Sequence, residues 1–154
     1  MLLLVALLEV GLQPAVNKLW TTIFPFFAEP EGYDLSAMFV PELRAQWVGA
    51  WGLVGLFVMS SLFSNFLGEE FLFRGVLLPK MEGVFGKWDW VANGVLFGFY
   101  HLHMPWSILS NILFGWVMAF TGKRFHSNWF PIILHNGQAV YFLFLILGLV
   151  LGLA

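Results

Sequence analysis

Long apolar stretches separated by short polar connections dominate the pattern of this chain. The main apolar segments cover residues 1–27, 45–78, 91–121 and 129–154, and prolines or charged residues mark the connections between them. A helix needs about 20 apolar residues to cross a hydrocarbon core of about 30 Å. The pattern therefore predicts an all-α protein, a polytopic membrane helix bundle with about five or six transmembrane helices around a buried polar site.

Two of these segments are predicted to contain interruptions. Residues 45–78 would reach roughly 50 Å as one helix, so we expect a tilt, a helix pair, or a break near Ser60-Ser61 or near residues 65–68. Pro105 separates a short helix at 91–103 from another at 106–121. Lys123 and Arg124 begin a basic loop, and residues 129–154 form the last long apolar segment.

Composition supports a membrane location. Hydrophobic residues make up 60% of the chain, charged residues 10%, and the mean hydropathy is +0.82. A soluble domain has about 45–50% apolar and about 25% charged residues. We therefore expect a multi-pass integral protein of the cytoplasmic or plasma membrane, with the lipid bilayer as a partner.

Charge and cysteine content exclude several classes of function. A net charge of −2 gives no basis for binding nucleic acid, and the absence of cysteine excludes disulfides and thiolate chemistry.

The loop charges suggest an orientation in the membrane. Lysines and an arginine fall in two connections, which the positive-inside rule places on the cytoplasmic side. These basic residues are Lys80, Lys87, Lys123 and Arg124.

We interpret residues 1–154 as a single transmembrane domain. Residues 1–27 are expected to form an N-terminal helix that is the remainder of a truncated segment, followed by an acidic loop at 28–42.

Small residues recur at helix-packing spacing in the groups Gly49/Gly52/Gly55, Gly94/Gly98 and Gly148/Gly152. Each group indicates either a close helix contact or the general abundance of glycine in membrane helices.

Three charged residues lie inside the apolar segment at 45–78, namely Glu69, Glu70 and Arg74. One such group at the centre of a bilayer costs about 2.5–3.5 kcal/mol on insertion scales. In a helix, Glu70 and Arg74 share a face and are predicted to form an ion pair. Glu69 points about 100° away and has no local cation. Glu70 and Arg74 therefore favour a structural role, whereas Glu69 is a candidate general base.

Histidines in other apolar segments complete a candidate site. His101 and His103 precede Pro105, and His135 lies in the last segment, whereas His126 is expected to be solvated in the basic loop. Two reactions remain open. Either Glu69 activates a water while imidazoles stabilise the oxyanion, or Glu69, His101 and His135 hold a divalent metal such as Zn²⁺ that activates the water.

The order of these residues resembles a known family. Glu69-Glu70-x-x-x-Arg74-Gly75, then Phe97-x-x-x-His101, then Pro131-Ile132-Ile133-Leu134-His135 resemble three motifs of the CAAX protease and bacteriocin-processing (CPBP, or Abi) family. The resemblance implies an all-helical intramembrane endopeptidase with a core at about residues 45–153. Its substrate would be a peptide or protein, including a membrane-anchored one.

The same resemblance implies a role for each residue. Glu69 would activate the water with help from His101, Glu70 and Arg74 would support the site, and His135 would help form the oxyanion pocket. The resemblance leaves the metal requirement open. One position departs from the pattern, because Ala139 stands where the family usually has asparagine. Asn136 and Gln138 are the nearby candidates to replace it, if Gly137 distorts the helix.

Two other functions compete with proteolysis. A non-catalytic membrane scaffold or partner-binding protein on the same fold is favoured by Ala139. A small transporter or proton pathway would use the same glutamate and histidines. The short chain and the lack of internal sequence repeats weigh against the transporter.

Overall fold

The computed structural model describes residues 7–33 and 39–153, and these residues form helices, turns and loops with one isolated bridge between Gly83 and Gly86. The first residues of the expected N-terminal helix (1–6) and part of the acidic loop (34–38) lie outside this range. In chain order the elements are η1 (Leu8–Leu12), α2 (Gln13–Ile23), η2 (Pro25–Phe27), α3 (Pro41–Trp47), α4 (Trp51–Ser60), η4 (Ser61–Leu77), α5 (Leu78–Lys80), α6 (Asp89–Tyr100), η5 (Pro105–Ser107), α7 (Ile108–Phe125) and α8 (Trp129–Val150).

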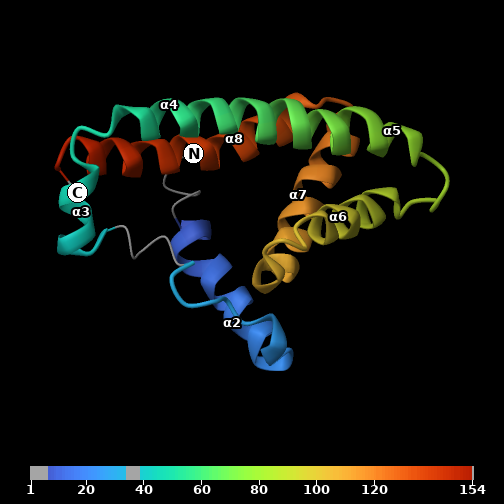
Figure 1. Ribbon diagram of the computed structural model, residues 1–154. Helices are drawn as coiled ribbons and strands as arrows, with labels where there is room; N and C mark the ends of the chain where they lie inside the picture. The colour runs from blue at the N-terminus through green and yellow to red at the C-terminus, as the bar shows by residue number, and fades with distance from the viewer. Residues whose placement is uncertain (1–6, 34–38, 154) are drawn as a thin grey trace.

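Two long antiparallel helices form the main body of the protein. α4, η4 and α5 run on without a break from Trp51 to Lys80, and α8 returns alongside them (Figure 1). The predicted break near Ser60-Ser61 is therefore absent, and so is the alternative break at 65–68. Instead, the winding changes at Ser61 to π-type hydrogen bonding, which persists through η4. Such winding is rare and often marks a functional site.

The beginning of this long helix differs from the expected one. Residues 45–47 belong to the separate helix α3, and a turn at Gly49 with φ of +81° redirects the chain before Trp51. The Gly49 N–H donates a hydrogen bond of 2.9 Å to the carbonyl oxygen of Val150, which fixes this turn against the end of α8. The positive φ requires glycine at this position, because a Cβ would be strained there.

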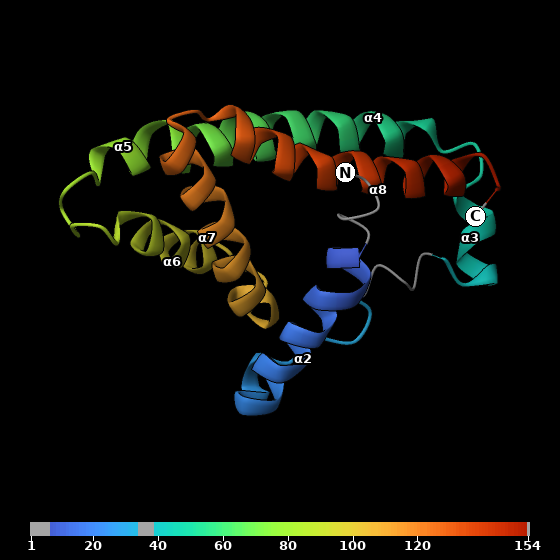
Figure 2. The same cartoon turned by 180° about the vertical axis from the view of Figure 1, so that it is seen from behind.

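Helices α6 and α7 form a tightly packed hairpin beneath the long pair (Figure 2). A Cβ built on Gly94 would lie 2.9 Å from the carbonyl carbon of Gly115, and one on Gly98 would lie 3.0 Å from the carbonyl oxygen of Ile108. Of the two alternatives for Gly94/Gly98, the structure shows the close helix contact. Cβ atoms on Gly52 and Gly55 would meet no atom within 4 Å, so these two glycines make no close helix contact.

Only two helices of the described chain are long and apolar enough to cross a membrane. They are the continuous helix Trp51–Lys80 and α8. The twelve residues of α6 reach roughly 18 Å, well short of a hydrocarbon core of about 30 Å. The all-helical fold is thus confirmed, whereas five or six spans are not.

The N-terminal helix α2 packs against α7 and η5. Trp20 Nε1 donates a hydrogen bond to the Pro105 carbonyl oxygen at 2.9 Å.

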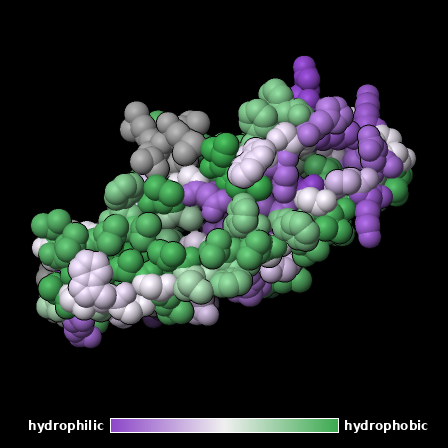
Figure 3. Space-filling model, turned by 90° about the horizontal axis from the view of Figure 1, so that it is seen from above, coloured by the Kyte–Doolittle hydropathy of each residue, from purple (hydrophilic) through white to green (hydrophobic). Residues whose placement is uncertain are grey.

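Hydrophilic side chains gather at the end of the molecule where α5 lies, while most of the face seen from above is apolar (Figure 3). At this end Asp89 links the turn before α6 to the end of α7. It accepts hydrogen bonds from the backbone N–H groups of Gly83 and Phe85 at 3.1 and 3.0 Å, and Lys123 Nζ lies 2.7 Å from its carboxylate. Lys123 and Arg124, expected in a loop, belong to the last turn of α7.

Candidate active site

The sequence-predicted charged residues and histidines meet in the interior of the helix bundle. Glu69, Glu70 and Arg74 come from η4, His101 follows α6, and His135 comes from α8. All five are buried, with exposed fractions between 0% and 8%. Buried charges persist in proteins only when they are paired and hydrogen-bonded. The contacts within this cluster therefore decide what it can do.

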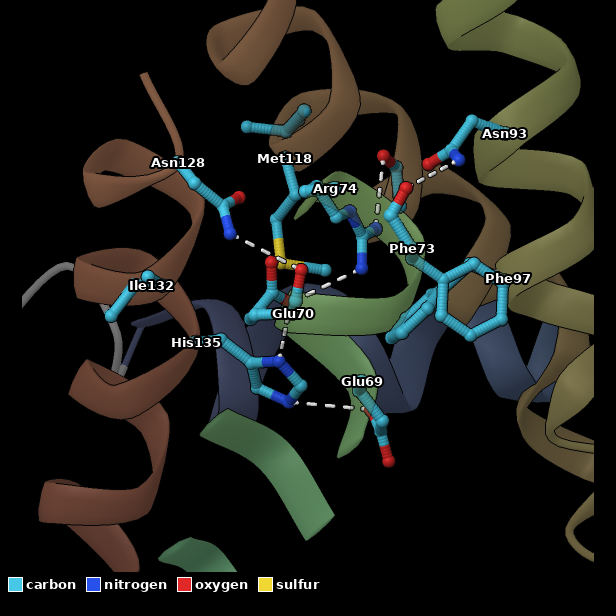
Figure 4. A network of polar contacts seen from close by, with 12 residues as sticks. Glu69, Glu70, Phe73, Arg74, Asn93, Phe97, Met118, Asn128, Ile132 and His135 are labelled. Carbon is cyan, nitrogen blue, oxygen red and sulfur yellow. Dashed lines mark hydrogen bonds and ion pairs between the residues drawn. The ribbon is translucent and has the colours of Figure 1, made fainter. Parts of the chain in front are cut away.

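Glu70 is the centre of the cluster. Its Oε1 accepts from Arg74 Nη1 at 3.1 Å, which confirms the predicted ion pair, and from His135 Nδ1 at 2.8 Å (Figure 4). Arg74 also donates to the Gly115 carbonyl oxygen, and its guanidinium lies over the Phe97 ring at 4.2 Å. This carboxylate therefore holds a cation from its own helix and an imidazole from α8.

Glu69 faces the two imidazoles. Its Oε2 lies 3.9 Å from His101 Nε2 and 3.8 Å from His135 Nε2. Ser64 Oγ donates a long hydrogen bond of 3.4 Å to Oε1. Oε2 is buried and has no hydrogen-bond partner in the described part of the chain. Separations of this size suit a shared water between the groups rather than direct hydrogen bonds.

Hydrogen bonds at Nδ1 fix the orientation of both imidazoles. His101 Nδ1 lies 2.8 Å from the Phe97 carbonyl oxygen, and His135 Nδ1 lies against Glu70. A carbonyl oxygen and an ionised carboxylate only accept hydrogen bonds, so each Nδ1 carries the hydrogen. The Nε2 atoms of both rings are then the ones that face Glu69.

His135 also changes the expected relation between the two glutamates. Their side chains were predicted to point apart and therefore to have separate roles. They do differ in direction, but His135 contacts Glu70 through Nδ1 and Glu69 through Nε2. The imidazole thus couples the ion pair to the candidate base.

Three polar side chains that the sequence did not single out support this cluster. Asn128 Nδ2 donates to the main-chain oxygen of Glu70 at 3.3 Å, and Asn93 Nδ2 donates to that of Phe73 at 2.9 Å. Ser64, already described, is the third. Asn93 precedes Phe97 and His101 by four and eight residues, a helical spacing that could have revealed it. Asn128 comes from a turn, where periodicity gives no signal.

Asn136, one of the two residues expected to replace the missing asparagine, is bonded within its own helix. α8 continues regularly through Gly137, and Asn136 Nδ2 donates to the Ile132 carbonyl oxygen of its own helix at 2.8 Å. Ala139 is buried one turn after His135. Gln138 is half-buried. A distortion at Gly137 is therefore absent because α8 keeps its α-helical hydrogen bonds.

The two remaining histidines lie outside the cluster. His103 is exposed and stacks on the His101 ring, with centroids 5.6 Å apart. His126 ends α7 in the left-handed conformation, with φ of +48°, and its side chain is exposed.

The metal hypothesis stays a prediction. Ligands of a tetrahedral Zn²⁺ at about 2.0–2.1 Å lie about 3.3 Å from one another, whereas the two imidazole nitrogens lie 3.8 and 3.9 Å from Glu69 Oε2. Among the described residues, no group of three or more His, Cys, Asp or Glu side chains is arranged to hold a metal ion. The candidates Glu69, His101 and His135 do not fit the ion in this arrangement.

Comparison with protein families identifies the family of this chain. The family model for the Type II CAAX prenyl endopeptidase Rce1-like proteins matches residues 45–141, which include the whole cluster. The chain belongs to this family. Neither a curated protein nor a solved structure matches the chain. The family resemblance seen in the three motifs is therefore confirmed.

Membership in this family establishes the general class of the protein. It implies a membrane peptidase that acts on a peptide or protein substrate. The two helices that are long and apolar enough to cross a membrane agree with this class.

Proposed function

We propose that this protein is an intramembrane endopeptidase of the CAAX protease type in which Glu69 activates the hydrolytic water. The observation that supports this most strongly is the position of Glu69 Oε2, buried and within 4 Å of the Nε2 atoms of both His101 and His135. A general base must lie within hydrogen-bonding reach of the proton it removes, directly or through one water.

In this proposal Glu69 takes one proton from the water, and the resulting hydroxide attacks the carbonyl carbon of the scissile peptide bond. His101 Nε2 accepts a hydrogen bond from the other O–H of the water and orients it, since Nδ1–H of that ring is held by the Phe97 carbonyl oxygen. When the C–N bond breaks, the proton on Glu69 passes to the leaving amine. The products are a carboxylic acid and an amine.

His135 stabilises the oxyanion as an imidazolium. Because its Nδ1–H is directed at Glu70, a neutral His135 would present a lone pair at Nε2 and could not donate. The buried cluster holds two carboxylates and one guanidinium, so a protonated His135 also balances its charge. Nε2–H then points to the side where Glu69 and the oxyanion lie.

The wider arrangement follows from the same proposal. The chain is one transmembrane domain with its core at about residues 45–153, spanning a cytoplasmic membrane several times, with about five or six helices at membrane depth. The substrate is a membrane-anchored peptide or protein. Zn²⁺ is not needed for the steps above.

The decisive experiment compares purified wild type with Glu69→Gln in proteoliposomes. The substrates are internally quenched peptides that end in a CAAX sequence, each with and without a prenyl group on its cysteine. We expect Glu69→Gln to lower kcat by at least about 100-fold, the lower range for loss of a general base. Glu31→Gln, an exposed loop residue, is the matched control and should match wild type.

Equal cleavage by wild type and Glu69→Gln would overturn the proposal. Cleavage that a chelator abolishes and Zn²⁺ restores would favour the metal mechanism instead.

One observation favours the non-catalytic alternative. Ala139 offers no hydrogen-bond donor one turn after His135, and Asn136 Nδ2 is bonded to the Ile132 carbonyl oxygen of its own helix. A scaffold on the same fold would show no cleavage in wild type and an unchanged cellular phenotype in Glu69→Gln.

A further inference from the structure

The N-terminal helix α2 contacts the loop that begins with His101. This loop, residues 101–107, joins α6 to α7 and contains the short helix η5. Figures 1 and 2 both show α2 beside the start of α7, where the loop ends. Trp20 Nε1 donates its hydrogen bond of 2.9 Å to the carbonyl oxygen of Pro105 in this loop. Because the family model matches residues 45–141, family membership assigns no role to this contact.

Neighbouring aromatic rings hold the Trp20 indole in the orientation that makes this bond. The indole lies 4.4 Å from the Phe24 ring and stacks on the Phe27 ring with centroids 5.7 Å apart. A second contact lies close by, since the Tyr33 ring meets the buried Trp106 ring edge-on at 5.3 Å. The segment that follows α2 therefore contacts the loop at two successive residues, and the indole N–H is oriented in advance.

Hydrogen bonds within the loop connect Pro105 to His101. The Pro105 carbonyl also accepts the Ile108 N–H, which closes η5. The Met104 carbonyl accepts the Ser107 N–H at 3.0 Å, and the Met104 N–H donates to the His101 carbonyl oxygen at 2.9 Å. A planar peptide bond and a proline ring that fixes φ leave little freedom between Met104 and the Pro105 carbonyl. A donor that holds this carbonyl therefore also holds the turn that starts at His101.

We propose that Trp20 is a positioning residue that keeps His101 in place for the reaction. The inference rests on the proposed peptidase function, in which His101 Nε2 orients the water. This atom lies 3.9 Å from Glu69 Oε2, a separation that one shared water fits. A displacement of about 1 Å at such a group costs up to about 100-fold in rate. Trp20 thus acts on catalysis through the loop and His101.

Trp20→Phe removes the N–H donor and keeps an aromatic ring at the same position. The Pro105 carbonyl retains its bond from Ile108, so the substitution leaves no unpaired acceptor and the fold should persist. Trp51→Phe is the matched control, because Trp51 at the start of α4 is 57% exposed.

The experiment follows cleavage and the histidine rings separately in the full chain. In Trp20→Phe, kcat on the CAAX peptides should fall about tenfold with KM within about twofold, since the lost alignment acts in the transition state. In ¹⁵N NMR of the protein in detergent, the ring nitrogen signals of His101 should shift, whereas those of the exposed His126 should not. Trp51→Phe should match wild type in both measurements.

The possible outcomes separate this proposal from the peptidase proposal. Shifted His101 signals in Trp20→Phe, in a protein whose wild type cleaves nothing, would support the positioning role and count against the peptidase. Unchanged His101 signals in folded Trp20→Phe would overturn the positioning role, and so would an unchanged kcat in a protein that cleaves. If thermal melting shows that Trp20→Phe is unfolded, Phe27→Leu decides by the same His101 comparison, because it removes the ring on which the indole stacks.

Discussion

At the scale of single residues, the position of His135 determines the chemistry of the site. The ring lies between two carboxylates, with Nδ1 at 2.8 Å from Glu70 and Nε2 at 3.8 Å from Glu69. In the proposed mechanism, Glu70 therefore acts on the reaction through His135, in addition to pairing with Arg74. The second glutamate of the motif is a positioning residue in this interpretation, since it orients the imidazole and stabilises its charged form.

Replacement of Glu70 tests this role. Glu70→Gln keeps the size of the side chain but removes the charge that stabilises an imidazolium at His135. We expect kcat to fall about 100-fold or more, the scale of losing one oxyanion donor, with little change in KM. Kinetics on the CAAX-peptide substrates and ¹⁵N NMR of the histidine rings measure the two effects.

A structural role alone would give a different result for this variant. If Glu70→Gln lowers the melting temperature but leaves kcat and the His135 nitrogen shifts unchanged, Glu70 only supports packing. Glu31→Gln again serves as the control for loss of one exposed carboxylate.

At the scale of elements, hydrogen bonds and an ion pair between the turn before α6 and the end of α7 stabilise the polar end of the molecule. Asp89 begins α6, accepts from the N–H groups of Gly83 and Phe85, and contacts Lys123 at the end of α7. The hydrogen bond from Lys123, together with those from the two N–H groups, holds the pKa of Asp89 below its usual value. A lowered pKa in the folded protein means that the ionised form stabilises the fold.

This contribution gives a prediction about pH. It is fully present above the unfolded-state pKa of about 3.9 and is lost as the pH falls through the lower pKa of the folded state. Asp89→Asn should therefore melt at a lower temperature than wild type at neutral pH, and the difference should shrink below about pH 4. Thermal melting by tryptophan fluorescence measures both curves.

The exposed Glu82 in the same turn provides the comparison. Glu82→Gln should melt like wild type at neutral pH. A melting difference for Asp89→Asn that stays constant down to pH 2 would contradict the assignment to ionised Asp89.

At the scale of the whole molecule, the two long antiparallel helices place their polar connections at one end. The Asp89–Lys123 contact of 2.7 Å brings the turn before α6 and the turn after α7 to the same side. Lys87 in the first of these turns and Lys123 and Arg124 at the end of α7 are basic residues that the positive-inside rule assigns to the cytoplasm.

The absence of cysteine makes this topology directly testable. Lys87→Cys and Arg124→Cys should react with a membrane-impermeant maleimide from the same side of sealed vesicles, the cytoplasmic one. Leu153→Cys, at the far end of α8, should react from the opposite side, because α8 is long enough to span the membrane. Labelling of Lys87→Cys and Leu153→Cys from one side would contradict a spanning α8.

The sequence by itself determined the helical class, the membrane character and the main members of the buried cluster. Apolar periodicity and buried charge identify Glu69, Glu70, Arg74, His101 and His135, because such groups are too costly in lipid to be retained without a partner. The i to i+4 spacing alone was enough to predict the Glu70–Arg74 ion pair.

Only the tertiary structure decided how these residues are connected. That His135 bridges both glutamates, that Asn128 reaches Glu70 from a turn, and that Asn136 bonds its own helix depend on how α8 and its preceding turn pack against η4. The turn at Gly49, with its hydrogen bond to Val150 of α8, likewise depends on a contact between helices. Sequence spacing fixes neighbours along one helix, whereas contacts between helices depend on rotation and depth, which no local pattern encodes.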